Sequence, residues 1–259
     1  MSPLKVLETN ILHASDVIYW LDAGTAQNEA EMLRISDSLS LQLSNRPADL
    51  QVVHSAGKTA FIRPPMNEIL FGLPTEADKQ RPPLPSYPLA GVVSDPQGRY
   101  NPRSFSITAG NGNGHGLRIY RSPLGTRFGP SGGLIGTLRF DSSGEGVPWA
   151  LLTLVVTTAI GTPLTFRCQA DGNGDFMLSM NRLPPLPEGI DNFSATLGIA
   201  AMESASADQP LDPAELVAMN LGDLDSDDTF SASINLTVIP GKVRLLRSSS
   251  QEFLAVQPS

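Results

Sequence analysis

Glycine and proline interrupt this chain so often that it cannot consist mainly of long helices. The 259 residues include 23 Gly and 22 Pro, whereas these residues usually make up about 7% and 5% of a protein. Both break helices, Gly through the conformational entropy that it loses and Pro through its missing N–H group. Because 41% of the residues are hydrophobic, the chain can still build packed cores. Many short strands joined by turns fit this pattern best.

Alternating apolar side chains predict where the strands lie. In residues 33–43, the residues Leu33, Ile35, Leu39, Leu41 and Leu43 fall on alternate positions, which is the pattern of a half-buried strand. Further strands are expected at residues 49–54, 59–62, 89–94, 104–108, 117–120, 134–140, 150–157, 164–170, 176–181, 193–200, 230–238 and 242–247. No helical pattern alternates with these segments, which favours antiparallel β-sandwiches over βαβ units.

One short helix is predicted near residues 213–221. Asp212 would be its N-cap, Pro213 its first helical residue and Glu215 the partner that completes a capping box. Gly222 would end it. The expected fold is therefore all-β, with two antiparallel β-sandwich domains and this one helix.

Turn-rich segments mark the domain boundary, the extended arms and a loop of the predicted fold. The Gly- and Pro-rich residues 122–133 place a boundary near Phe128, between an N-terminal domain (residues 1–125) and a C-terminal domain (residues 130–259). Residues 1–20, the Pro-rich loop 73–88 and residues 248–259 are interpreted as extended arms that could lie over neighbouring molecules. The Gly/Asn cluster at residues 111–116 predicts a mobile hairpin tip.

Between positions 133 and 181 several residues follow a recognisable order. A Gly opens a strand, a Pro-x-Ala step precedes a long hydrophobic strand, and a D-x-x-G-x-F turn follows. The residues in these places are Gly136, Pro148, Ala150, Asp171, Gly174 and Phe176. This order resembles the carboxypeptidase regulatory-like (transthyretin-like) β-sandwich family, although Gln169 and Ala170 replace the usual Thr before the turn. The resemblance implies a non-catalytic domain that packs against or binds another protein.

The acidic turn at residues 171–175 is a candidate metal site, and Asp223, Asp225 and Asp227 repeat its pattern in a turn that is equally well interpreted as a solvated acidic turn. Asp171, Asn173 and Asp175 match the first half of a calcium-binding loop, but an EF-hand would need Glu at the position of Arg182. The alternative is a β-turn in which the Asp and Asn side chains bond to the local backbone.

Catalytic patterns are weak elsewhere in the sequence. Residues 129–133 formally match G-x-S-x-G around Ser131, but they lack the strand before and the helix after that a nucleophile elbow requires, so a linker is the preferred interpretation. The three His residues are scattered, and the single Cys168 is expected to be a small buried hydrophobe. We therefore expect that the protein is not an enzyme and binds no cofactor. The alternative of a hydrolase that uses paired carboxylates stays open.

Charge and segment lengths limit the expected partners and location. The net charge of −8 opposes binding to nucleic acid. Residues 1–20 show no signal-peptide pattern, and the apolar run at residues 147–160 is too short to cross a bilayer as a helix. We expect a protein made in the cytoplasm without membrane insertion, either free or associated with a released particle.

These features favour a structural function. The whole chain resembles, in general appearance, accessory structural proteins of phage tails and contractile injection systems. We expect a non-enzymatic adaptor that forms homo-oligomers and docks into a larger protein assembly as a baseplate, spike, cap or fibre-attachment component. The alternative is a carbohydrate- or cell-surface-binding β-sandwich module, for which the candidate stacking residues are Tyr19, Trp20, Tyr87, Tyr100, Tyr120 and Trp149.

Overall fold

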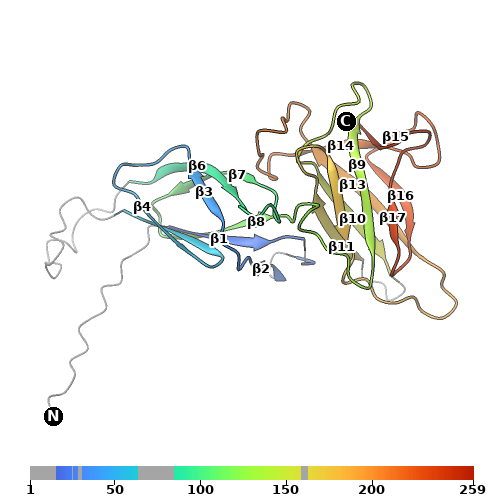
Figure 1. Ribbon diagram of the computed structural model, residues 1–259, viewed down its shortest axis with the longest axis horizontal. Helices are drawn as coiled ribbons and strands as arrows, with labels where there is room; N and C mark the ends of the chain where they lie inside the picture. The colour runs from blue at the N-terminus through green and yellow to red at the C-terminus, as the bar shows by residue number, and fades with distance from the viewer. Residues whose placement is uncertain (1–15, 25, 29–30, 64–84, 159–162) are drawn as a thin grey trace, which may run out of the picture.

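The structure, a computed structural model, describes residues 16–24, 26–28, 31–63, 85–158 and 163–259. These residues form strands joined by turns and loops, without an α-helix (Figure 1). The prediction of an all-β fold is therefore confirmed. Among these same residues, no helical segment has the length and apolar character needed to span a membrane.

The N-terminal half packs a five-stranded sheet against a three-stranded sheet. The larger sheet contains, in order, β2 (Leu33–Arg34), β1 (Asp16–Asp22), β5 (Lys58–Ile62) and β4 (Gln51–Ser55), with β8 (Asn113–Ile119) also paired to β1. The smaller sheet contains β3 (Ser40–Leu43), β6 (Tyr87–Ser94) and β7 (Arg103–Ala109). Apolar side chains from both sheets form one core, in which the Trp20 and Phe105 rings meet edge to face at 6.0 Å.

The C-terminal half is one curled ten-stranded sheet around a second core. Its path runs through β11 (Leu164–Gln169), β10 (Leu151–Thr157), β13 (Phe193–Ala201), β14 (Val217–Gly222), β18 (Leu254–Pro258), β9 (Gly133–Phe140) and β12 (Asp175–Ser179). Three strands attach beside this path: β15 (Phe230–Ser231) on β14, β16 (Ser233–Val238) on β13 and β17 (Val243–Leu245) on β9. The end strands β11 and β12 contact each other without forming a ladder.

Buried polar contacts join the two halves. The Asn101 amide donates to the carbonyls of Gln169 (3.1 Å) and Ala170 (3.0 Å) at the end of β11. The Arg103 guanidinium forms an ion pair with Asp212 at 2.7 Å. The Asn101 contacts cover part of the outer edge of β11, which would otherwise present unpaired backbone groups.

The helix predicted at residues 213–221 is wrong. Asp212 does accept a hydrogen bond from the Ala214 N–H group (2.9 Å), and its carbonyl accepts one from Glu215 (2.9 Å), but the helical turn stops there. Strand β14 follows instead, with Met219 and Leu221 buried. Pairing to β13 and β18 satisfies its backbone, so tertiary contacts override the local capping signal.

Two of the predicted arms contain structural strands. Residues 16–20 belong to β1, which lies inside the larger N-terminal sheet, whereas residues 1–15 lie outside the described residues. Residues 254–258 form β18, in which Leu254 and Val256 are fully buried. In the third arm, residues 73–84 are also outside the described residues, and β6 already begins at Tyr87.

Three further predictions need correction. Residues 113–116 are not a hairpin tip but the start of β8, which runs parallel to β1 along its full length. Residues 33–43 are not one strand: β2 and β3 are separated where Ile35 turns into the core, with its N–H group bonded to the Trp20 carbonyl at 2.9 Å. The sheets are also not purely antiparallel, because β9 pairs in parallel with both β17 and β18.

Candidate functional site

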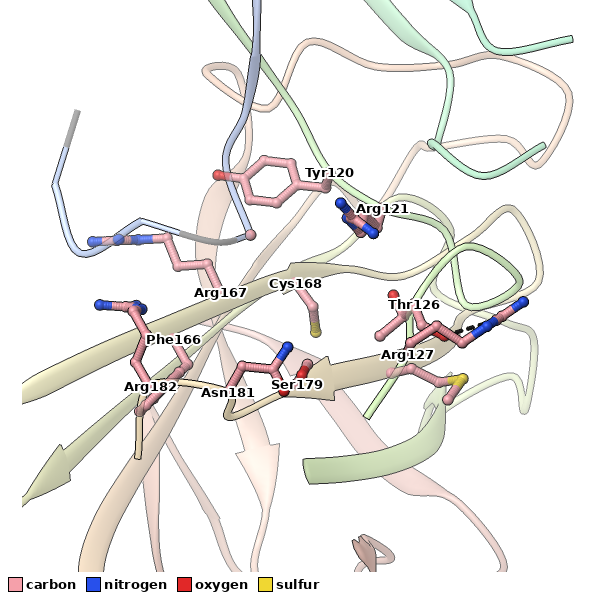
Figure 2. A pocket seen from close by; sticks show the side chains of 12 residues that line it. Tyr120, Arg121, Thr126, Arg127, Phe166, Arg167, Cys168, Ser179, Asn181 and Arg182 are labelled. Atoms are coloured by element: carbon pink, nitrogen blue, oxygen red, sulfur yellow. Dashed lines mark hydrogen bonds between the residues drawn. The ribbon is translucent and has the colours of Figure 1, made fainter. Parts of the chain in front are cut away.

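A pocket of about 190 Å³ opens where the two halves meet. It lies between β11 and β12, which do not pair with each other, and residues 120–127 of the connecting segment form another wall (Figure 2). We call it the arginine pocket. Its lining residues are Gly24, Tyr120, Arg121, Thr126, Arg127, Phe166, Arg167, Cys168, Met177, Ser179, Asn181 and Arg182.

The lining of the arginine pocket is strongly basic. Four of its residues are arginines and none is Asp or Glu, although the chain as a whole carries a net charge of −8. A concave site with charges of one sign concentrates ions of the opposite sign. The arginine pocket is therefore suited to a negatively charged group.

Strand alternation explains how β11 presents its side chains. Phe166 and Cys168 point into the C-terminal core and are 1% and 5% exposed, as expected from a period of two. Arg167 lies between them and points to the other face, where Figure 2 shows it extending toward the same side as Arg182. The prediction that Cys168 is a buried hydrophobe is confirmed, and burial raises the pKa of its thiol, which keeps it neutral.

The four guanidinium groups differ in their partners. Arg121 is held by Asp22, which accepts hydrogen bonds or ion-pair contacts at 3.0 Å. Arg182 donates to the Gln27 side-chain oxygen (2.9 Å) and to the Thr165 carbonyl (2.6 Å).

The remaining two arginines contact only backbone carbonyls. Arg167 reaches the Gln27 carbonyl at 3.4 Å. Arg127, at the opposite rim, donates to the carbonyls of Leu124 (2.8 Å) and Thr126 (3.0 Å). Within the described part of the chain, Arg127, Arg167 and Arg182 thus bond to neutral oxygens and form no carboxylate ion pair.

Burial and mutual repulsion set the charge state of the buried groups. The pKa of Arg182 is lowered, first by burial and also by the nearby Arg167, while Glu31 opposes this shift. Burial raises the pKa of Tyr120, and the neighbouring arginines oppose that shift. An arginine remains charged at neutral pH in either case, so the pocket stays cationic there.

Two hydroxyl groups in the pocket wall lack partners. The Ser179 Oγ atom is buried without a hydrogen bond. Tyr120 is 2% exposed, and its hydroxyl makes no hydrogen bond with a described residue. Buried polar atoms are usually satisfied by protein, water or an ion.

The calcium candidates do not converge on one point. One Asp171 carboxylate oxygen accepts the backbone N–H groups of Asn173 (2.8 Å) and Asp175 (3.1 Å), which closes the turn. Asp175 instead accepts a hydrogen bond from the Thr137 hydroxyl at 2.5 Å. Among the residues that the structure describes, no three His, Cys, Asp or Glu side chains gather as metal ligands.

Other candidate chemistry is also dispersed. The Ser131 hydroxyl donates to the Leu183 carbonyl at 3.0 Å. His54 contacts Thr59, and His115 contacts the buried Asp16 at 3.3 Å. A catalytic histidine would contact its nucleophile, but neither of these two described histidines has a recorded contact with Ser131 or Cys168.

The aromatic residues mostly belong to the cores. Five of the six candidate stacking residues are at most 9% exposed; they are Trp20, Tyr87, Tyr100, Tyr120 and Trp149. Only Tyr19 is half-exposed, and Arg34 covers its ring at 4.3 Å. Sugar stacking requires open aromatic faces, so the structure offers little support for the carbohydrate-binding alternative.

A second surface feature lies on β17. All three residues of this strand are exposed, with Val243 at 47% and Leu245 at 48%. The strand pairs with β9 on one edge, and no described strand pairs with its other edge. A groove of about 380 Å³ runs beside it and is lined by Lys242 and Arg244 but by no acidic residue.

Sequence reasoning missed the arginine pocket. Its residues come from four separate segments and share no linear motif. The available signal was Arg167 between Phe166 and Cys168, since alternation places a charged residue on the outer face of a predicted strand. No protein-family model, curated protein or solved structure matches the chain.

Proposed function

We propose that this protein is a non-enzymatic structural adaptor that docks into a larger protein assembly. The observation that carries the proposal is β17, an exposed strand with two apolar side chains, Val243 and Leu245, and with one edge that no described strand pairs with. Such an edge presents unpaired N–H and C=O groups and can accept a strand from another chain. The dispersed His, Ser and Cys side chains support a binding function over a catalytic one.

The charge at β17 favours a different protein as the partner. Lys242 and Arg244 flank the groove, and pairing β17 with a second copy would bring these like charges together, which is destabilising. Arg244 also borders a neighbouring groove that contains Asp225, but no acid lines the β17 groove. The partner segment is therefore extended, with apolar side chains alternating with acidic ones.

The type of assembly rests on sequence appearance alone. The phage-tail or contractile-injection particle remains the proposed setting, with the chain as an accessory component. Homo-oligomer formation through another surface stays a prediction that light scattering can test: a ring or trimer would support it, and a monomer at all concentrations would contradict it.

A peptide titration tests the docking proposal. The probe is a short fluorescent peptide in which valine alternates with aspartate, and the comparison peptide has lysine in place of aspartate. Fluorescence anisotropy should show saturable binding of the acidic peptide only. The double substitution V243S and L245S should weaken this binding by about tenfold, because it removes apolar area that the peptide would cover.

Val217→Ser is the matched control variant. Val217 is 59% exposed on β14 and does not line the β17 groove, so its substitution should leave the affinity unchanged. Absence of acidic-peptide binding, equal binding of both peptides, or equal loss in the V217S variant would contradict the proposal.

A further inference from the structure

Carboxylates among the described residues neutralise only part of the positive charge of the arginine pocket. Arg121 is neutralised by Asp22, whereas Arg127, Arg167 and Arg182 bond to neutral oxygens within the described residues. Guanidinium groups placed together in a concave site repel one another: the pKa of Arg182 is lowered first by burial, and the charge of Arg167 adds to this shift against the opposing effect of Glu31. An anion between them would relieve it.

The backbone of β11 adds a donor at the same place. The Pro163 carbonyl, the Thr165 N–H and the Gln169 carbonyl all bond outward to side chains of the N-terminal half. Because backbone groups alternate in direction along a strand, Arg167 shares this outward orientation. Its N–H group therefore faces the open edge beside the pocket.

The size and the wall of the pocket fit a small polar ligand. A volume of about 190 Å³ is well above the roughly 10–15 Å³ that a cavity needs to hold one water. The Ser179 Oγ atom is buried without a partner, and the Tyr120 hydroxyl makes no hydrogen bond with a described residue, so each can donate a hydrogen bond to a ligand. The Cys168 thiol is kept neutral by burial, and no acid lines the pocket, so the nearest carboxylates are those of Asp22 behind Arg121 and of Glu31 near Arg182.

We propose that the arginine pocket binds a phosphate-sized oxyanion, held chiefly by Arg167 and Arg182. Arginine suits this ligand because its planar fork can bond two oxygens at once. The anion is either free phosphate or the phosphate group of a small metabolite, since both present the same oxygens. This site is independent of docking at β17, because the two share no lining residue.

Binding at this place would link the two halves of the chain. Tyr120 and Arg121 follow the last strand of the N-terminal half, whereas Arg167 and Arg182 belong to the C-terminal half. A ligand that binds only the folded protein stabilises it in proportion to its occupancy. The midpoint of thermal unfolding should therefore rise with phosphate concentration and approach the logarithmic dependence of a single site.

The test is isothermal titration of the full chain with sodium phosphate at constant ionic strength, supported by thermal unfolding. Glycerol phosphate, sodium sulfate and sodium acetate provide separate arms. Saturable phosphate binding with weaker acetate binding is expected. Tighter binding of glycerol phosphate than of phosphate would identify a metabolite as the ligand, and the reverse would identify the free ion.

Variants at Arg167 locate the bound anion. Arg167→Gln should weaken phosphate binding by at least about tenfold, as expected for the loss of hydrogen bonds to a charged group. Arg167→Lys keeps the charge but loses the fork, and its affinity should fall between those of wild type and R167Q. Arg139→Gln is the matched control, since Arg139 is an exposed arginine that bonds one carbonyl at 2.7 Å.

The proposal is overturned if phosphate shows no saturable effect beyond that of chloride, or if R167Q binds phosphate as tightly as wild type or R139Q. If R167Q is misfolded by circular dichroism, Arg182→Gln replaces it, because Arg182 is the other arginine to which the proposal assigns the anion. Unchanged phosphate affinity in R182Q would then count against the proposal.

Discussion

At the scale of single residues, one buried carboxylate organises the junction side of the N-terminal half. Asp22 is 5% exposed and accepts hydrogen bonds from the Tyr100 hydroxyl (3.1 Å), the Arg121 side chain (3.0 Å) and the Gly24 N–H group (3.2 Å). A buried carboxylate is costly unless such donors surround it. Sequence alone did not reveal this role, because Asp22 occupies a position of β1 where alternation predicts an apolar residue.

Tyr100 makes the stability of this region sensitive to alkaline pH. Burial, and then the charge of Asp22, raises the pKa of Tyr100 to about 12, compared with about 10 in an unfolded chain. The stabilisation that this raised pKa gives to the folded state is fully present below pH 10. It is lost as the pH rises toward 12, because Tyr100 ionises more readily in the unfolded chain than in the folded one. Tyr100→Phe should lower the free energy of unfolding by about 1 kcal/mol at pH 8, because a hydrogen bond is lost. It should also make the fall of this free energy between pH 10 and 12 less steep. Thermal unfolding from pH 8 to 12 checks this; an unchanged slope in Y100F would contradict it.

At the scale of elements, periodicity located many of the strands, but partners decided the ambiguous ones. Residues 217–222 follow a helix-capping sequence, yet Met219 and Leu221 also alternate. Only the neighbouring strands β13 and β18 select the extended form. Strand β1 was missed for a related reason. Its inward positions include the buried Asp16, which accepts hydrogen bonds from the backbone N–H groups of Gly110, in the loop before β8, and of Asn113, the first residue of β8.

The C-terminal strand β18 carries a direct test of its structural role. Leu254 is fully buried where β18 lies between β9 and β14. Leu254→Ala should lower the free energy of unfolding by about 2–5 kcal/mol through lost burial and a cavity. Glu252→Ala is the nearby control: its carboxylate is 85% exposed in an ion pair with Arg247, and such pairs contribute about 0–1 kcal/mol. Urea unfolding measures both, and equal effects would favour a loosely attached arm.

At the scale of the whole molecule, the two cores are joined by polar contacts rather than by a continuous hydrophobic interior. Asn101 is 3% exposed, and its amide donates hydrogen bonds to two backbone carbonyls of the C-terminal half. These contacts and the arginine pocket were not predictable, because their residues lie far apart in the sequence and share no spacing pattern. The alternation of apolar and polar residues along one strand does not show which strand edges, far apart in the sequence, come into contact.

Asn101→Ala tests how strongly the halves are coupled. The substitution leaves two buried carbonyls without this donor and should cost about 1–3 kcal/mol. It should also broaden or split the calorimetric unfolding transition, since each half retains its own core. Asn235→Ala is a suitable control, because Asn235 is exposed on β16 and far from the junction contacts described above. A transition that stays as sharp as in wild type would show that Asn101 does not couple the halves.

The most direct test of the account is hydrogen–deuterium exchange of the full chain with and without the acidic valine–aspartate peptide. Pairing at the free edge of β17 predicts that peptide binding slows exchange in the segment containing Val243, Arg244 and Leu245, while exchange in β4 and β7 stays unchanged. Peptide binding without added protection of that segment would contradict docking at β17.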